Sequence, residues 1–279
     1  MKPALSIVFF TVASGAGLGT LALLALFSHG GVGILVGMVL VSAGLLASVA
    51  HLAAPRNAWR SFARFRTSWL SREAVFAVLL YPAAAAWYFG VPFFSWITLG
   101  LAWTILFCTA MIYASLKPIR EWRTPLTPLN YFLLGHFSGA LICLAVTGED
   151  VFRVAAFVLL LAAGAAKAAY YREIEGAERP TLQSALTMPT AARIKLLDAG
   201  HTHGTFLTDE FAFCLAREHA EALRMVVAGA AFIAPLLLLA FLDDAAPLAA
   251  ILCLGGLLVE RWLFFAEARH TVNLYQTRT

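Results

Sequence analysis

The chain has 279 residues, of which 61% are hydrophobic and only 13% are charged. This composition is far from that of a water-soluble globular domain and indicates an integral membrane protein. The formal net charge is +4, but the basic residues lie at the joints between apolar stretches, where they determine membrane topology. We therefore expect no nucleic-acid partner.

About eight apolar stretches follow one another, each close to the ~20 residues that cross a ~30 Å hydrocarbon core. They cover residues 4–27, 31–54, 72–90, 92–116, 125–147, 151–170, 222–242 and 246–267. The sequence therefore predicts an all-α integral membrane protein, a bundle of about eight transmembrane helices. We expect residues 1–279 to form a single transmembrane domain with one excursion at about 171–221.

Basic residues are distributed unequally over the joints. The joint 55–72 holds five arginines and no acid, and the joint 117–124 and the excursion are also rich in Lys and Arg. The alternate joints hold a single basic residue, Arg153. By the positive-inside rule, the basic joints and both termini face the cytoplasm. We expect a multi-pass protein of the bacterial inner membrane.

Two ionisable residues fall inside apolar stretches next to the arginine-rich joint. His51 ends one stretch and Glu73 begins the next. Such groups are costly at membrane depth and suggest function. An imidazole and a carboxylate beside Arg56 and Arg60 could handle the protons and carbonyl oxygens of a quinone. A simpler interpretation stays open: His51 bonds a neighbouring carbonyl, and Glu73 interacts with a helix N-terminus or an arginine.

Other ionisable residues are weaker candidates. His136 could ligate haem together with His51, although two histidines on two helices at unmatched depth are more often hydrogen-bonded packing residues. The pair His201 and His203 has no further metal ligand nearby, so a solvated loop is the better interpretation. The four cysteines form no Cys-x-x-Cys pair, so we expect no iron–sulfur cluster, zinc site or other metal in this chain.

Three further charged residues inside apolar stretches are Lys167, Glu260 and Arg261. They lie near the cytoplasmic ends of their stretches, where long side chains either extend toward the interface or pair with one another.

Several patterns concern packing rather than chemistry. Glycines four residues apart occur in three stretches and let helix backbones approach closely: Gly15 and Gly19, Gly33 and Gly37, Gly135 and Gly139. Pro82 and Pro235 are expected to kink their helices.

The excursion at 171–221 is too long to be an ordinary connection. Thr208, Asp209 and Glu210 resemble the start of an interfacial helix. With the joint 55–72, the excursion could form a cytoplasmic docking platform, or it could pack on its own bundle.

Several motifs resemble the DmsC-type membrane anchors of dimethyl sulfoxide reductase-like molybdoenzymes. Those at the second joint and in the last stretch are residues 51–59 (HLAAPRNAW), 68–73 (SWLSRE) and 260–270 (ERWLFFAEARH). Residues 167–172, 205–208 and 217–220 are most similar to the branch that serves cytoplasmic sulfite-oxidising (Soe-type) enzymes.

The resemblance implies a specific function. Such an anchor holds an iron–sulfur (four-cluster ferredoxin-like) subunit and a molybdopterin catalytic subunit on the membrane, and it carries no haem or metal itself. It also binds ubiquinone or menaquinone as the substrate next to the terminal cluster. The functional histidine of the family matches His51, and the functional acid matches Glu73. Arg56 and Arg60 would then raise the electron affinity of the quinone or bind the partner subunit.

One departure bears on the orientation. In the dimethyl sulfoxide reductase anchor the corresponding joint is periplasmic, whereas here its five arginines predict a cytoplasmic joint. That orientation favours a sulfite-oxidising complex in which electrons flow toward quinone, with electroneutral turnover. The alternatives are a quinol-oxidising reductase anchor of the same fold and a transporter unrelated to redox chemistry.

Overall fold

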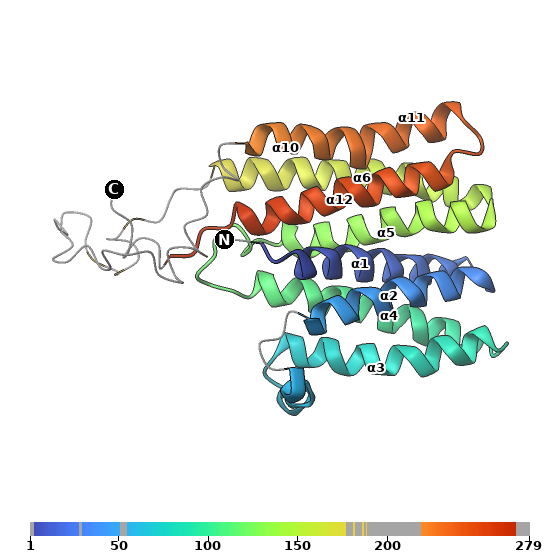
Figure 1. The fold of residues 1–279 in the computed structure, drawn as a ribbon, viewed down its shortest axis with the longest axis horizontal. Helices are drawn as coiled ribbons and strands as arrows, with labels where there is room; N and C mark the ends of the chain where they lie inside the picture. The colour runs from blue at the N-terminus through green and yellow to red at the C-terminus, as the bar shows by residue number, and fades with distance from the viewer. Residues whose placement is uncertain are drawn as a thin grey trace.

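The computed structural model describes residues 3–27, 30–50, 55–176, 181, 186, 188 and 219–271. In these residues the chain forms a bundle of helices that run side by side (Figure 1). The helices are α1 (Leu5–Leu26), α2 (Val32–Ala50), the 3-10 helix η1 (Pro55–Arg64), α3 (Trp69–Tyr88), α4 (Phe93–Ala114), α5 (Leu126–Thr147), α6 (Asp150–Gly176), α10 (Ala220–Val227), the π-helix η2 (Ala228–Ile233), α11 (Ala234–Phe241) and α12 (Ala246–Ala266).

Seven segments of the described chain are long and apolar enough to cross a membrane: α1, α2, α4, α5, α6, the continuous run of α10, η2 and α11, and α12. The remaining long helix, α3, has 20 residues and runs alongside α4 (Figure 1). Ser71, Arg72 and Glu73 in its first turns lower its mean hydropathy. The predicted all-α membrane bundle of about eight helices is confirmed.

The joints rich in Lys and Arg meet at one end of the bundle, where α1, α3, α5 and α10 begin and α2, α4, α6 and α12 end (Figure 1). We call this the basic end. At the opposite end, Arg153 lies 3.6 Å from carboxylate oxygens of both Asp150 and Asp243. The alternation of basic and non-basic joints therefore corresponds to two physical ends of the molecule.

The centre of the bundle is α1, which packs against α2, α4, α5 and α12. Its backbone approaches that of α5 closely, because glycines face each other across that contact. A Cβ atom on Gly19 would lie 2.0 Å from the carbonyl oxygen of Gly135, and one on Gly139 would lie 2.4 Å from the carbonyl carbon of Gly19. The close approach predicted from the glycine spacing is confirmed at this interface.

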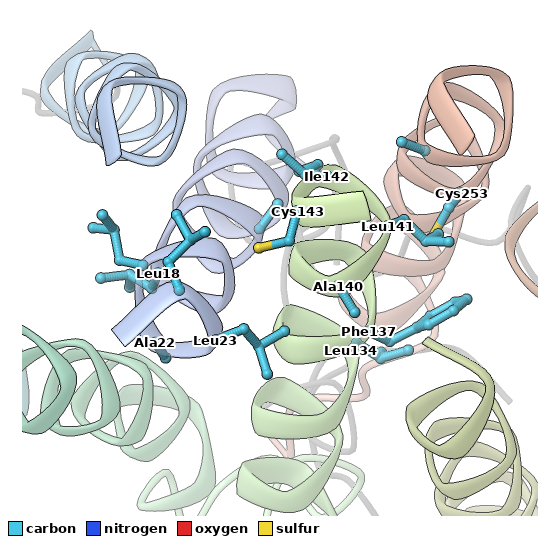
Figure 2. Packing of buried hydrophobic residues seen from close by; sticks show 14 of the residues in the cluster. Leu18, Ala22, Leu23, Leu134, Phe137, Ala140, Leu141, Ile142, Cys143 and Cys253 are labelled. Atoms are coloured by element: carbon cyan, nitrogen blue, oxygen red, sulfur yellow. The ribbon is translucent and has the colours of Figure 1, made fainter. Parts of the chain in front are cut away.

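Around this contact, α5 directs different side chains to different neighbours (Figure 2). Cys143 points toward α1, and its thiol lies 3.6 Å from the carbonyl oxygen of Thr20. Phe137 points away from α1 and stacks on Phe232 of η2, with ring centroids 6.0 Å apart. The helix α5 therefore lies between α1 on one side and η2 on the other.

The two prolines behave differently. Pro82 lies inside α3, which continues past it. Pro235 follows the π-helix η2, Ala228–Ile233. Proline has no N–H and its ring clashes with the preceding turn, so a wider π turn there is a common accommodation. Pro235 thus perturbs its helix through a π segment.

The basic end is closed by the joint between α4 and α5. Trp122 of this joint donates a hydrogen bond to the carbonyl oxygen of Phe264, at 2.9 Å. Ile119 forms an isolated β-bridge with His270. These contacts, with the stacked rings of Trp122 and Phe264, bind the joint to the end of α12. The predicted excursion helix at residues 208–210 lies outside the described residues.

Candidate functional site

Glu73 is buried one turn inside the basic end of the bundle. The cap of α3 places it there: the Ser68 side chain accepts a hydrogen bond from the backbone N–H of Ser71 at 3.4 Å, and the helix begins at Trp69. At about 1.5 Å per residue, Glu73 lies ~6 Å inside the helix start. Its side chain faces α4, and the residue is only 3% exposed.

The partner of the Glu73 carboxylate is the hydroxyl of Thr109 on α4, which donates a hydrogen bond to Oε1. The same hydroxyl lies 2.9 Å from the carbonyl oxygen of Ile105. A hydroxyl has one proton and can also accept. Thr109 can therefore donate to an ionised Glu73, or accept from a protonated Glu73 while donating to Ile105. Glu73 keeps a hydrogen-bond partner in either protonation state, as a proton relay requires.

Arg72, the neighbour of Glu73, organises the joint instead of the buried site. Its side chain donates to the carbonyl oxygens of Phe65 at 3.0 Å and Arg66 at 2.7 Å. Its guanidinium lies 4.3 Å from the centroid of the Trp69 ring. Phe65 also packs edge-on against Phe76 of α3, at 5.7 Å between centroids. The end of the arginine-rich joint is thus attached to α3.

The other predicted site residues are only partly placed. His51 lies outside the described residues; it follows Ala50, the last residue of α2. A hydrogen bond of 2.8 Å between the hydroxyls of Ser42 and Tyr81 ties α2 to α3. Arg56 and Arg60 lie on η1 and are exposed. They are therefore not buried beside Glu73, and their assignment to a quinone stays a prediction.

His136 is a packing residue in the described structure. Its Nε2 accepts a hydrogen bond from the indole N–H of Trp103 at 3.0 Å. Its Nδ1 lies 2.8 Å from the carbonyl oxygen of Phe132, to which it donates in that tautomer. Both ring nitrogens are thus engaged in hydrogen bonds. This geometry is the hydrogen-bonded packing that the sequence offered as the alternative to haem ligation.

Three charged residues form a buried cluster between α6 and α12. Lys167 makes an ion pair with Glu260 Oε1, and Arg261 lies 3.1 Å from Glu260 Oε2. Lys167, Glu260 and Arg261 are 4%, 0% and 4% exposed. The sequence left pairing and extension toward the interface as alternatives, and pairing is what the structure shows. Arg261 also lies 3.9 Å from the centroid of the Tyr131 ring.

A cavity of about 10 Å³ lies between α1, α5 and α12, next to this cluster. Tyr131, Arg261, Thr11 and Ser138 contribute its polar lining. The hydroxyl of Tyr131 is buried and has no hydrogen-bond partner among the described residues. The cavity therefore adjoins the ion cluster through Arg261.

A second ion network lies nearer the end of the bundle. Arg224 of α10 pairs with Glu175 of α6 and lies 2.7 Å from Glu267, which follows α12. Burial raises the pKa of Glu267, and the charge of Arg224 opposes that shift. Burial also lowers the pKa of His270. Among the described residues, no group of three or more His, Cys, Asp or Glu side chains could hold a metal ion.

Comparison with known proteins decides the family. The family described as DMSO reductase anchor subunit (DmsC) matches residues 1–266. The chain belongs to the DmsC family. A similar protein, one of the subunits of the sulfite dehydrogenase of Allochromatium vinosum, is 36% identical over 99% of this chain and 98% of its own length. This DmsC-family chain is therefore a membrane anchor subunit, and the resemblance seen in its motifs is confirmed.

Sequence patterns did not reveal Thr109, the partner of Glu73. The two residues are 36 positions apart on different helices, and a threonine in an apolar helix most often bonds its own backbone. Tyr131 was missed for a similar reason, since an aromatic residue in an apolar helix has no signal that separates packing from a polar role. Only the packing of the DmsC-family bundle brings these groups together.

Proposed function

We propose that this anchor passes electrons from a partner iron–sulfur subunit to a quinone, as part of a sulfite-oxidising complex with a molybdopterin catalytic subunit. The quinone is ubiquinone or menaquinone, bound as a substrate where α2 ends and α3 begins. His51, Glu73, Arg56 and Arg60 are the residues assigned to it. The observation that carries the proposal is Glu73, a carboxylate buried against Thr109 in a protein similar over nearly its whole length to a sulfite dehydrogenase subunit.

The chemistry requires two electrons and two protons for each quinone. Oxidation of sulfite with water to sulfate releases two electrons and two protons, and the electrons pass through the partner's clusters. His51 would donate a hydrogen bond or proton to one quinone oxygen, since imidazole titrates near neutral pH. Glu73 would relay protons, because Thr109 offers it a hydrogen bond in both protonation states.

The two arginines of the proposed site have a different role. Arg56 and Arg60 are exposed at the basic end, where positive charge would raise the electron affinity of the quinone or attract the partner subunit. By the positive-inside rule this end would face the cytoplasm of a bacterial cell, with both termini on the same side. The partners would then dock on the cytoplasmic face, and turnover would be electroneutral.

The proposal is tested with the intact complex purified from membranes. His51→Ala and Glu73→Gln should leave assembly unchanged and slow sulfite-dependent quinone reduction by roughly 100-fold, the contribution of a positioned acid or base. Sulfite oxidation with a soluble artificial electron acceptor should stay at the wild-type rate, because that route bypasses the anchor. Glu149→Gln, at the opposite end of the bundle, is the matched control. Wild-type rates of quinone reduction in both site variants would refute the assignment.

The family description supports a second direction of flow. In a DMSO reductase-type complex the same site would oxidise quinol and send electrons to a reductase subunit. The identity of the partner distinguishes the two directions: a molybdopterin subunit with a twin-arginine export signal would support the reductase, and one without it would support sulfite oxidation.

A further inference from the structure

The 3-10 helix η1 presents a stripe of aromatic side chains. A 3-10 helix has three residues per turn, so positions three apart lie above one another. Trp59 and Phe62 have that spacing within η1, and Phe65 continues it in the turn that follows. These residues are 64%, 44% and 41% exposed. Trp59 and Phe62 therefore form an exposed aromatic face on η1 in the part of the chain that the structure describes, and Phe65, which also contacts Phe76, continues it toward α3.

Arginines flank this stripe. Arg60 and Arg64 lie on the two other faces of the three-residue turn, and Arg56 and Arg66 lie at its two ends. All four are exposed. Arg60 lies 5.6 Å from the centroid of the Trp59 ring, and none of the four forms an ion pair within the described residues. A group of like charges without acids repels itself and favours an anionic partner.

The 3-10 helix η1 lies beside α3, and hydrogen bonds hold the short connection between them. The backbone N–H groups of Thr67 and Ser68 both bond to the carbonyl oxygen of Arg64 at 3.0 Å, and Arg72 bonds to the carbonyl oxygens that follow. Figure 1 shows η1 as the blue coil at the outer edge of the bundle, beside the start of α3. It lies at the level where the helices end, away from the centre of the basic end.

We propose that η1 lies in the plane of the membrane surface and binds anionic phospholipid headgroups. Trp59 and Phe62 would enter the boundary between headgroups and acyl chains, where aromatic side chains are favoured. Arg60 and Arg64 would bond the phosphates on either side, since a guanidinium matches phosphate with two parallel hydrogen bonds. An aromatic stripe between arginines, at headgroup level and at the edge of the bundle, fits a lipid surface better than a protein docked over the bundle end.

The test uses the full-length chain in detergent with equal amounts of phosphatidylglycerol and phosphatidylcholine. Native mass spectrometry counts the lipids that stay bound. The wild type should retain phosphatidylglycerol preferentially. Because each arginine near an anionic surface contributes a factor of about five, Arg60→Gln with Arg64→Gln should lower this preference roughly 25-fold. Trp59→Ala with Phe62→Ala should reduce retention of both lipids at unchanged charge.

Two controls separate this site from other effects. Lys117→Gln with Arg123→Gln removes the same charge from exposed positions of another basic joint and should leave the preference intact. Glu73→Gln should also retain phosphatidylglycerol like the wild type, so failure of the quinone proposal would leave this result unchanged.

An unchanged preference in the Arg60 and Arg64 double variant would overturn the proposal, and so would an equal loss in the control pair. Retained lipid with loss of co-purifying partner proteins would also overturn it, because η1 would then be a docking contact for the partners. A thermal unfolding midpoint equal to that of the wild type shows for each variant that the bundle is intact.

Discussion

At the scale of single residues, the candidate site depends on one hydrogen bond between two helices. Glu73 is buried and has the Thr109 hydroxyl as its partner. A buried carboxylate that loses its donor bears the desolvation cost alone. His136 shows the opposite case, a buried histidine with both nitrogens engaged in packing. The partners of a side chain, more than its residue type, therefore separate a functional candidate from a structural one.

Substitution of Thr109 tests whether it positions Glu73. Thr109→Val keeps the shape but removes the hydroxyl, and it should lower sulfite-dependent quinone reduction about tenfold, the effect of one hydrogen bond to a charged group. Thr109→Ser restores the hydroxyl and should restore most of the rate. The maximum rate and the KM for quinone are measured at several pH values. If Thr109 has a purely structural role, Thr109→Val should lower the thermal unfolding midpoint and leave the pH dependence of the rate of quinone reduction unchanged.

At the scale of helices, two interfaces hold the bundle by different means. The contact between α1 and α5 depends on the absence of side chains at Gly19 and Gly139. The link between α6 and α12 is an ion pair, since Lys167 of α6 pairs with Glu260 of α12, whose carboxylate also pairs with Arg261 on its own helix. Close packing and satisfied polar groups replace the hydrophobic driving force, which is weak between helices in lipid.

The glycine contact predicts a position-specific cost. Gly19→Ala should destabilise the purified protein by about 1–3 kcal/mol, because the new methyl group would meet the Gly135 carbonyl and force α1 and α5 apart. Gly15→Ala is the control on the same helix, since a Cβ there has nothing within 4 Å. Thermal unfolding in detergent measures both. Equal midpoints for the two variants would contradict this account.

The charged cluster predicts an order of effects. Glu260→Gln leaves two buried cations without a counter-charge and should cost about 3–5 kcal/mol. Lys167→Met leaves the pair of Glu260 and Arg261 intact and should cost less. Unfolding in detergent would rank the variants, with Arg153→Gln as the control at the other end of the bundle. A cost for Glu260→Gln no greater than that for Lys167→Met would rule out charge compensation as the cause.

At the scale of the whole molecule, the distribution of charge over the joints divides the bundle into a basic end and an end with little basic charge. The candidate site, the ion cluster and the closed joint at residues 115–125 lie toward the basic end. In a bilayer that arrangement determines which side of the membrane a partner can approach. The proposed direction of electron transfer therefore depends on the orientation of the whole bundle.

Cysteine labelling in intact cells checks the orientation. Cys108, Cys143 and Cys253 are buried, so a Cys214→Ser background should react little with a membrane-impermeant maleimide. Asp244→Cys, exposed at the end opposite the basic one, should be labelled from outside. Asn57→Cys on η1 should react only after the membrane is permeabilised. Labelling of Asn57→Cys in intact cells would reverse the proposed topology.

Much of this fold was predictable from local features of the chain. Apolar length placed most helices within a few residues of their observed bounds, although α6 (Asp150–Gly176) continues past the predicted end at residue 170. The spacing of arginines identified the basic end, because membrane insertion responds to segment hydrophobicity and flanking charge. Motifs around Glu73 and Glu260 indicated the family. Glu73 itself was predictable as a candidate, since a carboxylate at the start of an apolar helix is unusual.

Contacts between segments distant in the sequence could not be predicted from it. The pairing of Glu73 with Thr109, the shared carboxylate of Glu260 and the exposed aromatic stripe of η1 each depend on which helix faces lie together. Periodicity cannot specify those faces in a bundle whose helices are apolar on all sides, since lipid and protein neighbours select the same residues. Side-chain packing in three dimensions selects one arrangement, and that selection assigned each buried polar group its partner.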